Sequence, residues 1–95
     1  MKIVWTSKAL ADLDEIFDYI LRENPHAAVD VLDRIEQAAL QLANYPGIGR
    51  PGRVASTREL IISDLPWILP YLTRADTVTI LRVIHAARQW PGEFD

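Results

Sequence analysis

Two stretches with helical periodicity, joined by a single Asn-Pro step, constrain the fold of this chain more than any other feature. Between Lys8 and Glu23, apolar residues recur every three or four positions and acidic residues take the opposite side, which predicts an amphipathic helix. A second helix is expected from Pro25 to Asn44, where apolar residues rich in alanine again share one stripe. Asn24 can cap this helix, and Pro25 suits its first turn. Because the link is so short, the two helices should fold back as an antiparallel hairpin.

The remainder of the chain favours β-structure. The first stretch, Lys2 to Trp5, is apolar and β-prone, and it precedes Thr6, a good N-cap residue. Three later strands are expected at Thr57–Ser63, Trp67–Thr73 and Val78–His85, with turns at Asp64–Pro66 and Arg74–Thr77. Connections this short produce an antiparallel β-meander. Pro70 lacks a ladder donor, so its strand should be bulged there or leave that position unpaired.

Between the helices and these strands lies the sequence GIGRPGRVAS, Gly47–Ser56. Three glycines and a proline within six residues require a non-regular loop, from which Arg50 and Arg53 project. The expected architecture is an α+β domain spanning residues 1–95, in which an N-terminal strand precedes an antiparallel helical hairpin packed on a C-terminal antiparallel β-meander. The other face of the sheet, with the loop that opens onto it, is where side chains can meet a partner.

The composition excludes several classes of site. The chain has no cysteine, and its two histidines lie far apart in sequence, so we expect no disulfide, no metal site and no cofactor. Nothing near the N-terminus resembles a signal peptide, and no apolar run reaches membrane-spanning length. We therefore expect a cytoplasmic protein with no membrane partner.

The charge is distributed unevenly along the chain. The net charge of −3 argues against a protein that wraps a nucleic-acid backbone. Because this average hides a basic second half, direct nucleic-acid binding is left open. The residues up to Gly49 include four basic and eight acidic side chains, whereas Arg50 to Trp90 holds six arginines against three acidic residues. The second half therefore offers either a functional basic surface or simply the counterpart of solvated acidic helices.

Several side chains of the second half form a usable set for cleaving RNA. Such a reaction needs a base for the ribose hydroxyl, an acid for the leaving oxygen and cations for the developing charge. The candidate catalytic residues are Arg58, Tyr71, His85 and Arg88, with Arg50 and Arg53 as further cations. The signal has low specificity, because a lone histidine at a strand end is more often structural and no second histidine or lysine completes an acid–base pair.

Other residues of this half have competing structural interpretations. Arg82 can reach a carboxylate, for example Glu59, or extend to the sheet edge. Three tryptophans adjoin strand ends and are expected to close the core rather than stack on bases: Trp5, Trp67 and Trp90.

Three segments of the chain together resemble a known family. They are GRPGRVASTREL in the loop and first meander strand, the stretch from Pro66 to Tyr71, and RVIHAARQWP at Arg82–Pro91. With the order of segments around them, they resemble the RelE/ParE superfamily of type II toxin–antitoxin toxins, and most closely its ParE-like branch. The resemblance runs from Trp5 to Pro91.

The resemblance implies a toxin neutralised by a cognate antitoxin, whose C-terminal segment wraps the toxin with helical and extended pieces. RelE-like members cleave mRNA on the ribosome, whereas ParE-like members poison DNA gyrase. Ribosome-dependent members commonly have many basic residues and a basic or tyrosine-bearing tail. This chain is acidic overall and ends in GEFD after Pro91, which favours the gyrase-directed interpretation.

Two other interpretations remain open, an mRNA endonuclease and a degenerate toxin that retains only antitoxin binding. For a protein target, apolar anchors and a few arginines suffice. The expected target-binding residues are Arg50, Arg53, Arg58, Arg82 and Arg88.

Overall fold

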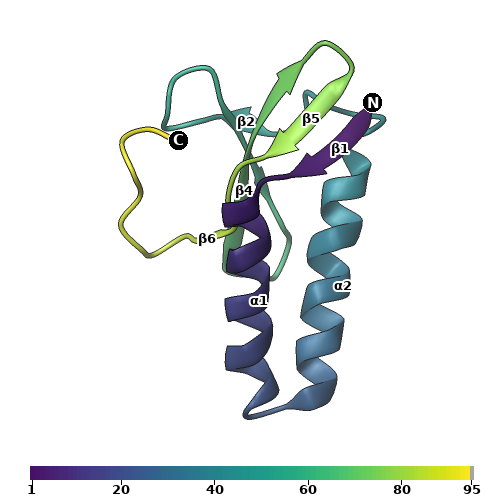
Figure 1. Ribbon diagram of the computed structural model, residues 1–95, viewed down its shortest axis with the longest axis vertical. Helices are drawn as coiled ribbons and strands as arrows, with labels where there is room; N and C mark the ends of the chain where they lie inside the picture. Colours follow the sequence, from purple (N-terminus) through teal and green to yellow (C-terminus); the bar gives the residue numbers. More distant parts are fainter. Residues whose placement is uncertain (95) are drawn as a thin grey trace.

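Two helices pack against one face of a six-stranded sheet in the computed structural model, which describes residues 1–94 (Figure 1). The elements in chain order are β1 (Lys2–Trp5), α1 (Ser7–Leu21), α2 (Pro25–Gln41), β2 (Arg50–Pro51), β3 (Arg58–Ile61), β4 (Trp67–Arg74), β5 (Thr77–Ile80) and β6 (Ile84–His85). The expected α+β architecture, with a helical hairpin on a β-meander, is confirmed.

Side-chain caps begin both helices at the predicted residues. The Thr6 hydroxyl oxygen accepts a hydrogen bond from the Ala9 amide at 3.0 Å, and the Asn24 side chain accepts one from the Ala27 amide at 3.1 Å. Each helix ends a few residues earlier than predicted, because the chain tightens into bonds between residues three apart after Leu21 and after Gln41.

The sheet has the strand order β1-β5-β4-β3-β2, with β6 also paired to β4. The β3-β4-β5 meander is antiparallel, as predicted. β1 pairs parallel to β5 at the opposite edge from β2, as Figure 1 shows. This parallel pairing is possible because the helical hairpin returns the chain to the starting side of the sheet.

The prediction of one continuous last strand, Val78–His85, is wrong, because the segment forms two strands, β5 and β6. Both β5 and β6 pair with β4, through Tyr71 with Ile80 and Ile68 with Ile84, so three residues on one strand oppose two on the other. This is a β-bulge, opposite Pro70. The Leu81 amide donates to the Pro70 carbonyl at 2.9 Å. The missing donor of Pro70 therefore disturbs the ladder as expected, but the extra residue lies on the facing strand.

The loop Gly47–Ser56 is more regular than predicted, because Arg50 and Pro51 form β2 and pair with β3. Close packing requires two of its three glycines, Gly49 and Gly52. A Cβ on Gly49 would lie 2.6 Å from the Tyr71 hydroxyl oxygen, and a Cβ on Gly52 would collide with the Thr57 hydroxyl. The left-handed backbone conformation in this loop occurs at Ser56, with φ 67°.

The core lies between the hairpin and the sheet. Fully buried side chains from both layers meet there, including Ile35 of α2, Leu69 of β4 and Ile80 of β5. Ala9 of α1 and Ala39 of α2 are also buried in this core. Trp5 and Trp67 pack against the edge of this cluster. None of the helices within residues 1–94 is long and apolar enough to cross a membrane.

Candidate functional site

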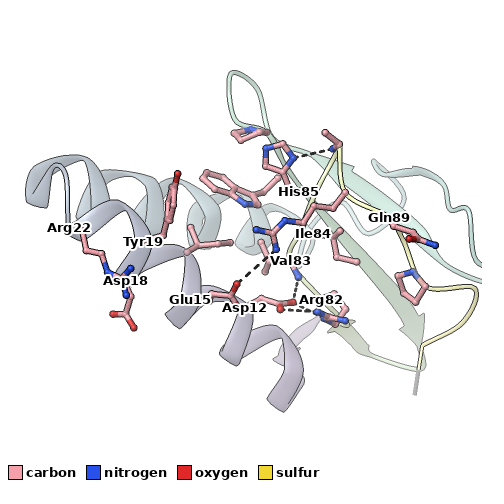
Figure 2. A pocket seen from close by; sticks show the side chains of 16 residues that line it. Asp12, Glu15, Asp18, Tyr19, Arg22, Arg82, Val83, Ile84, His85 and Gln89 are labelled. Atoms are coloured by element: carbon pink, nitrogen blue, oxygen red, sulfur yellow. Dashed lines mark hydrogen bonds and ion pairs between the residues drawn. The ribbon is translucent and has the colours of Figure 1, made fainter.

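The structure divides the candidate residues between two regions. Arg50 and Arg53 contact the carboxylate of Glu59, whereas Arg58 on β3 contacts the Gly49 carbonyl next to Arg50; we call these four residues the arginine surface. A separate groove of about 950 Å³, here the α1 groove, lies between α1 and the segment from β6 towards the C-terminus (Figure 2). Its lining includes the half-buried candidates Arg82 and His85 and the exposed Arg88.

Glu59 is buried at the centre of the arginine surface, with 1% of its side chain exposed. One carboxylate oxygen accepts a hydrogen bond from the Arg50 Nε at 3.1 Å, and the other accepts one from the Arg53 backbone amide at 2.7 Å. The Arg53 Nε lies 3.9 Å away. Since an unpaired buried carboxylate is costly, these contacts account for its position. The predicted pairing of Glu59 with Arg82 is wrong.

The three arginines of this surface are held but not enclosed. The Arg53 guanidinium lies over the Trp90 ring, 4.1 Å from its centroid, and the Arg58 guanidinium donates to the Gly49 carbonyl at 2.8 Å. Arg50 and Arg53 each leave 46% of their side chains exposed. With three guanidinium groups against one carboxylate, the arginine surface is locally positive. Trp90 was predicted to close the core, but its ring contacts the Arg53 guanidinium and it is not part of the buried core cluster.

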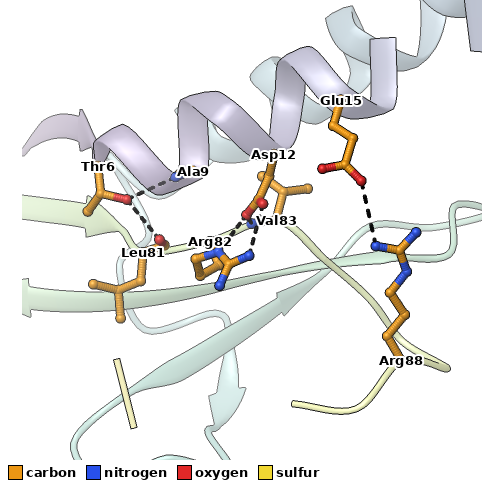
Figure 3. A network of polar contacts seen from close by, with 8 residues as sticks. All are labelled: Thr6, Ala9, Asp12, Glu15, Leu81, Arg82, Val83 and Arg88. Atoms are coloured by element: carbon orange, nitrogen blue, oxygen red, sulfur yellow. Dashed lines mark hydrogen bonds and ion pairs between the residues drawn. The ribbon is translucent and has the colours of Figure 1, made fainter. Parts of the chain in front are cut away.

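Arg82 forms a two-pronged ion pair with Asp12 of α1, at 2.7 and 3.0 Å (Figure 3). The same carboxylate accepts a hydrogen bond from the Val83 amide at 2.8 Å, within the β-bulge. The hydrogen bond to Asp12 raises the pKa of Arg82, against the smaller opposing effect of burial. The predicted carboxylate partner therefore exists, but it comes from the helix.

The α1 groove is electrically mixed. Its lining includes three acidic side chains and three arginines, namely Asp12, Glu15, Asp18, Arg22, Arg82 and Arg88. Arg88 approaches Glu15 at 3.9 Å, with 72% of each side chain exposed, so this contact contributes little (Figure 3). Apolar side chains from α1 and the sheet, among them Ile16, Trp67 and Ile84, complete the lining.

His85 and Tyr71, the proton-transfer candidates, are both engaged within the fold. The His85 Nδ1 accepts a hydrogen bond from the Ala87 amide at 3.1 Å, and the ring meets Trp67 edge-on. Tyr71 is fully buried, and its hydroxyl donates to the Pro46 carbonyl at 2.7 Å while accepting from the Gly49 amide at 3.0 Å. Within residues 1–94 no cluster of side chains could hold a metal ion.

The two carboxylates that organise these regions were missed as site residues by sequence reasoning. Asp12 resembles Asp14 and Glu15 in the periodic pattern, so nothing in sequence marks it as the partner of a distant arginine. Glu59 carried a usable signal, because it lies inside an apolar strand immediately after Arg58.

Comparison with known proteins now places the chain. A family model described as the ParE toxin of the type II toxin–antitoxin system parDE matches residues 3–90. The chain belongs to the ParE toxin family. The resemblance inferred from its three sequence segments is therefore confirmed.

Other members and relatives support the family assignment over nearly the full length. The chain is 52% identical over 90 residues to a Sinorhizobium fredii protein named "Putative toxin Y4kP", covering 95% of this chain and 93% of that one. It is 42% identical over 87 residues to Toxin RelE2 of Caulobacter vibrioides, covering 92% and 97%. A structure described as the chromosomal ParDE TA system from P. aeruginosa superposes with a TM-score of 0.82 at 31% identity, covering 90% and 95%. This ParE family member is thus a toxin of a type II toxin–antitoxin system.

Proposed function

We propose that this toxin inhibits growth by poisoning DNA gyrase and is neutralised by a cognate antitoxin. The observation that carries the proposal is the commitment of both proton-transfer candidates to the fold: His85 Nδ1 and the Tyr71 hydroxyl already have partners. RNA cleavage needs a free base and acid near a cationic site. The positive arginine surface is instead suited to recognition, and an overall charge of −3 suits a protein target better than a polyanion.

For target binding we propose the arginine surface, with Arg50, Arg53 and Arg58 as the contacting side chains. Guanidinium groups bind carboxylates with two parallel hydrogen bonds, which gives both orientation and affinity. Arg82 shares its donors with Asp12, so its first role is structural. Arg88 is exposed at the rim of the α1 groove and remains a second candidate for target contact.

For the antitoxin we propose the α1 groove. Its apolar lining with charges of both signs suits an amphipathic segment that has apolar anchors and charged side chains at its edges. Occupation of the groove would leave the arginine surface free, so the two partners can be separated by mutation.

A second candidate function is ribosome-dependent cleavage of mRNA. The observation in its favour is the 42% identity to a relative named Toxin RelE2. A third is a degenerate toxin that only binds antitoxin, which the same fold would allow.

Expression of the chain with and without its antitoxin, followed by a supercoiling assay with purified gyrase, tests these alternatives. Gyrase poisoning predicts growth arrest with filamentation, a DNA-damage response and loss of supercoiling in vitro. Immediate loss of translation with cut mRNA and unchanged supercoiling would replace the proposal by the nuclease function. Absence of any arrest would leave only antitoxin binding.

A further inference from the structure

Glu59 is the only buried residue within residues 1–94 that carries a charge. Its side chain lies on the sheet face opposite the hairpin core, since the neighbouring Leu60 packs into that core. Replacing a buried ion pair by apolar residues is often neutral or stabilising. Stability alone therefore gives little reason for a carboxylate at this position, and its contacts suggest another role.

Those contacts all reach the loop that carries the arginines. One oxygen binds the Arg50 side chain at 3.1 Å, while the other binds the Arg53 backbone amide at 2.7 Å. A single carboxylate thereby joins β3, β2 and the start of the following loop. The Arg53 side chain then extends across Trp90, and Arg58 is tied to the Gly49 carbonyl. Every guanidinium of the arginine surface has an anchor on one side.

We propose that Glu59 is a positioning residue that fixes Arg50 and Arg53 of the arginine surface for binding an acidic surface of the target protein. This inference rests on the proposed function, in which the arginine surface contacts gyrase. Ordering the arginines before binding lowers the conformational entropy lost in the complex. An acidic protein surface is favoured over a nucleic-acid backbone, because a chain of net charge −3 with three arginines here offers little counterion release.

The variant Glu59→Gln distinguishes positioning from simple charge attraction, because the two predict effects of opposite sign. The substitution makes the surface more positive, so attraction alone predicts tighter binding to an acidic target. If Glu59 positions the arginines, the dissociation constant for purified gyrase should rise about tenfold or more. The matched control Glu36→Gln makes the same change in net charge at an exposed site on α2 and should leave the dissociation constant unchanged.

Two readouts separate positioning from general destabilisation. Affinity for the antitoxin should remain at the wild-type value, because the α1 groove does not include Glu59. Backbone amide exchange should accelerate within residues 50–57, because the single carboxamide oxygen of glutamine cannot accept from both the Arg50 side chain and the Arg53 amide, and stay unchanged in α1 and α2. In the Arg53→Ala background, Glu59→Gln should weaken gyrase binding far less than in the wild type, since part of what it positions is gone.

A further variant covers the case in which Glu59→Gln does not fold. Glu59→Asp keeps the charge but shortens the reach, so it should retain antitoxin affinity and lose gyrase affinity. Unchanged or tighter gyrase binding by the folded Glu59 variants, when Arg50→Ala and Arg53→Ala weaken it, would overturn the positioning role and leave the proposed function standing.

Growth arrest in cells distinguishes the gyrase proposal from the Glu59 inference, because arrest requires contact with the cellular target even if that target is not gyrase. If the wild-type toxin does not bind gyrase, the proposed function fails. The Glu59 inference is then supported if Glu59→Gln abolishes arrest with antitoxin affinity intact, and overturned if arrest persists. Binding of naked DNA that is lost with the arginines would overturn the acidic protein partner.

Discussion

At the scale of single residues, hydrogen-bond partners decide what each candidate side chain can do. His85 and Tyr71 belong to the residue types that transfer protons, yet the His85 Nδ1 and the Tyr71 hydroxyl are both hydrogen-bonded to backbone groups. Arg58 differs, because its side chain is exposed and a single carbonyl contact leaves several guanidinium donors free. The residue types alone suggested catalysis, whereas the contacts favour recognition.

Replacing His85 by alanine should lower stability by about 1–2 kcal/mol and leave toxicity intact, because the Ala87 amide loses its acceptor and Trp67 loses an edge contact. Thermal unfolding and growth arrest measure the two effects. His85→Asn offers an oxygen near the position of Nδ1 and should recover part of the stability. A toxin inactivated as completely by His85→Asn as by an arginine substitution would show that the histidine acts in catalysis.

Replacing Arg58 by alanine should abolish or strongly reduce growth arrest while the toxin still folds and binds antitoxin. The physical reason is the loss of an exposed guanidinium from the arginine surface, where truncation of such a contact typically costs about 2 kcal/mol or more of binding free energy. Arg74→Ala, at the exposed end of β4, is the matched control and should remain toxic. Unchanged toxicity of Arg58→Ala would remove this residue from the target-binding surface.

At the scale of elements, one carboxylate joins the first helix to the irregular part of the sheet. Pro70 cannot donate to the ladder, the facing strand forms a bulge, and the Val83 amide turns to Asp12 instead. Arg82 completes the contact. Arg82, the first arginine of the RVIHAARQWP segment, therefore stabilises the junction between α1 and β6. This junction also forms one wall of the α1 groove.

Replacing Asp12 by alanine should lower the free energy of unfolding by about 1–3 kcal/mol, since it leaves Arg82 and the Val83 amide without their acceptor. Denaturant unfolding measures the loss, with exposed Asp14→Ala as a control expected within about 0.5 kcal/mol of wild type. An equal effect of the two substitutions would contradict the structural role of the pair.

The raised pKa of Arg82 determines how this contribution depends on pH. Because the folded-state pKa of Arg82 is raised above its ordinary value, the stabilisation is fully present below that ordinary value and is lost only as the pH rises through the raised one. Titration of Arg82 should therefore leave the stability difference between wild type and Asp12→Ala unchanged across neutral pH.

At the scale of the whole molecule, one edge of the sheet joins strands from distant parts of the chain. β1 lies beside β5, so the first five residues close an edge that the chain completes only after residue 77. Both helices and the strands β3, β4 and β5 contribute to one buried cluster. The hairpin and the sheet thus depend on each other for burial of their apolar faces.

The shared core predicts a single cooperative unfolding transition. The enthalpy at the midpoint should be about 65 kcal/mol for a chain of this length, and the calorimetric and van't Hoff enthalpies should agree. Differential scanning calorimetry provides both values. Two separate transitions would indicate that the hairpin and sheet fold as independent units, against the prediction of one domain spanning residues 1–95.

Short-range patterns along the chain were sufficient to predict most of the local structure and the family. Periodicity predicted both helices, Asn24 and Thr6 predicted their caps, and short connections predicted the meander, because these features depend on neighbours within a few residues. Pro70 also predicted a disturbed ladder, since its missing donor is a property of the residue alone. The three segments that resemble the family are also patterns of neighbouring residues, so they identified the family without the structure.

Which charged groups pair with one another follows from the three-dimensional fold. Asp12 and Arg82 are separated by 70 positions, and Arg50 reaches Glu59 because β2 pairs with β3. Ion pairing depends on distance in space, and equally charged residues on one helix are indistinguishable in a periodic pattern. The predicted arginines therefore lie in two regions: the positive arginine surface, which holds the buried Glu59, and the α1 groove, where acidic side chains balance them. Composition and motif spacing could not predict this division.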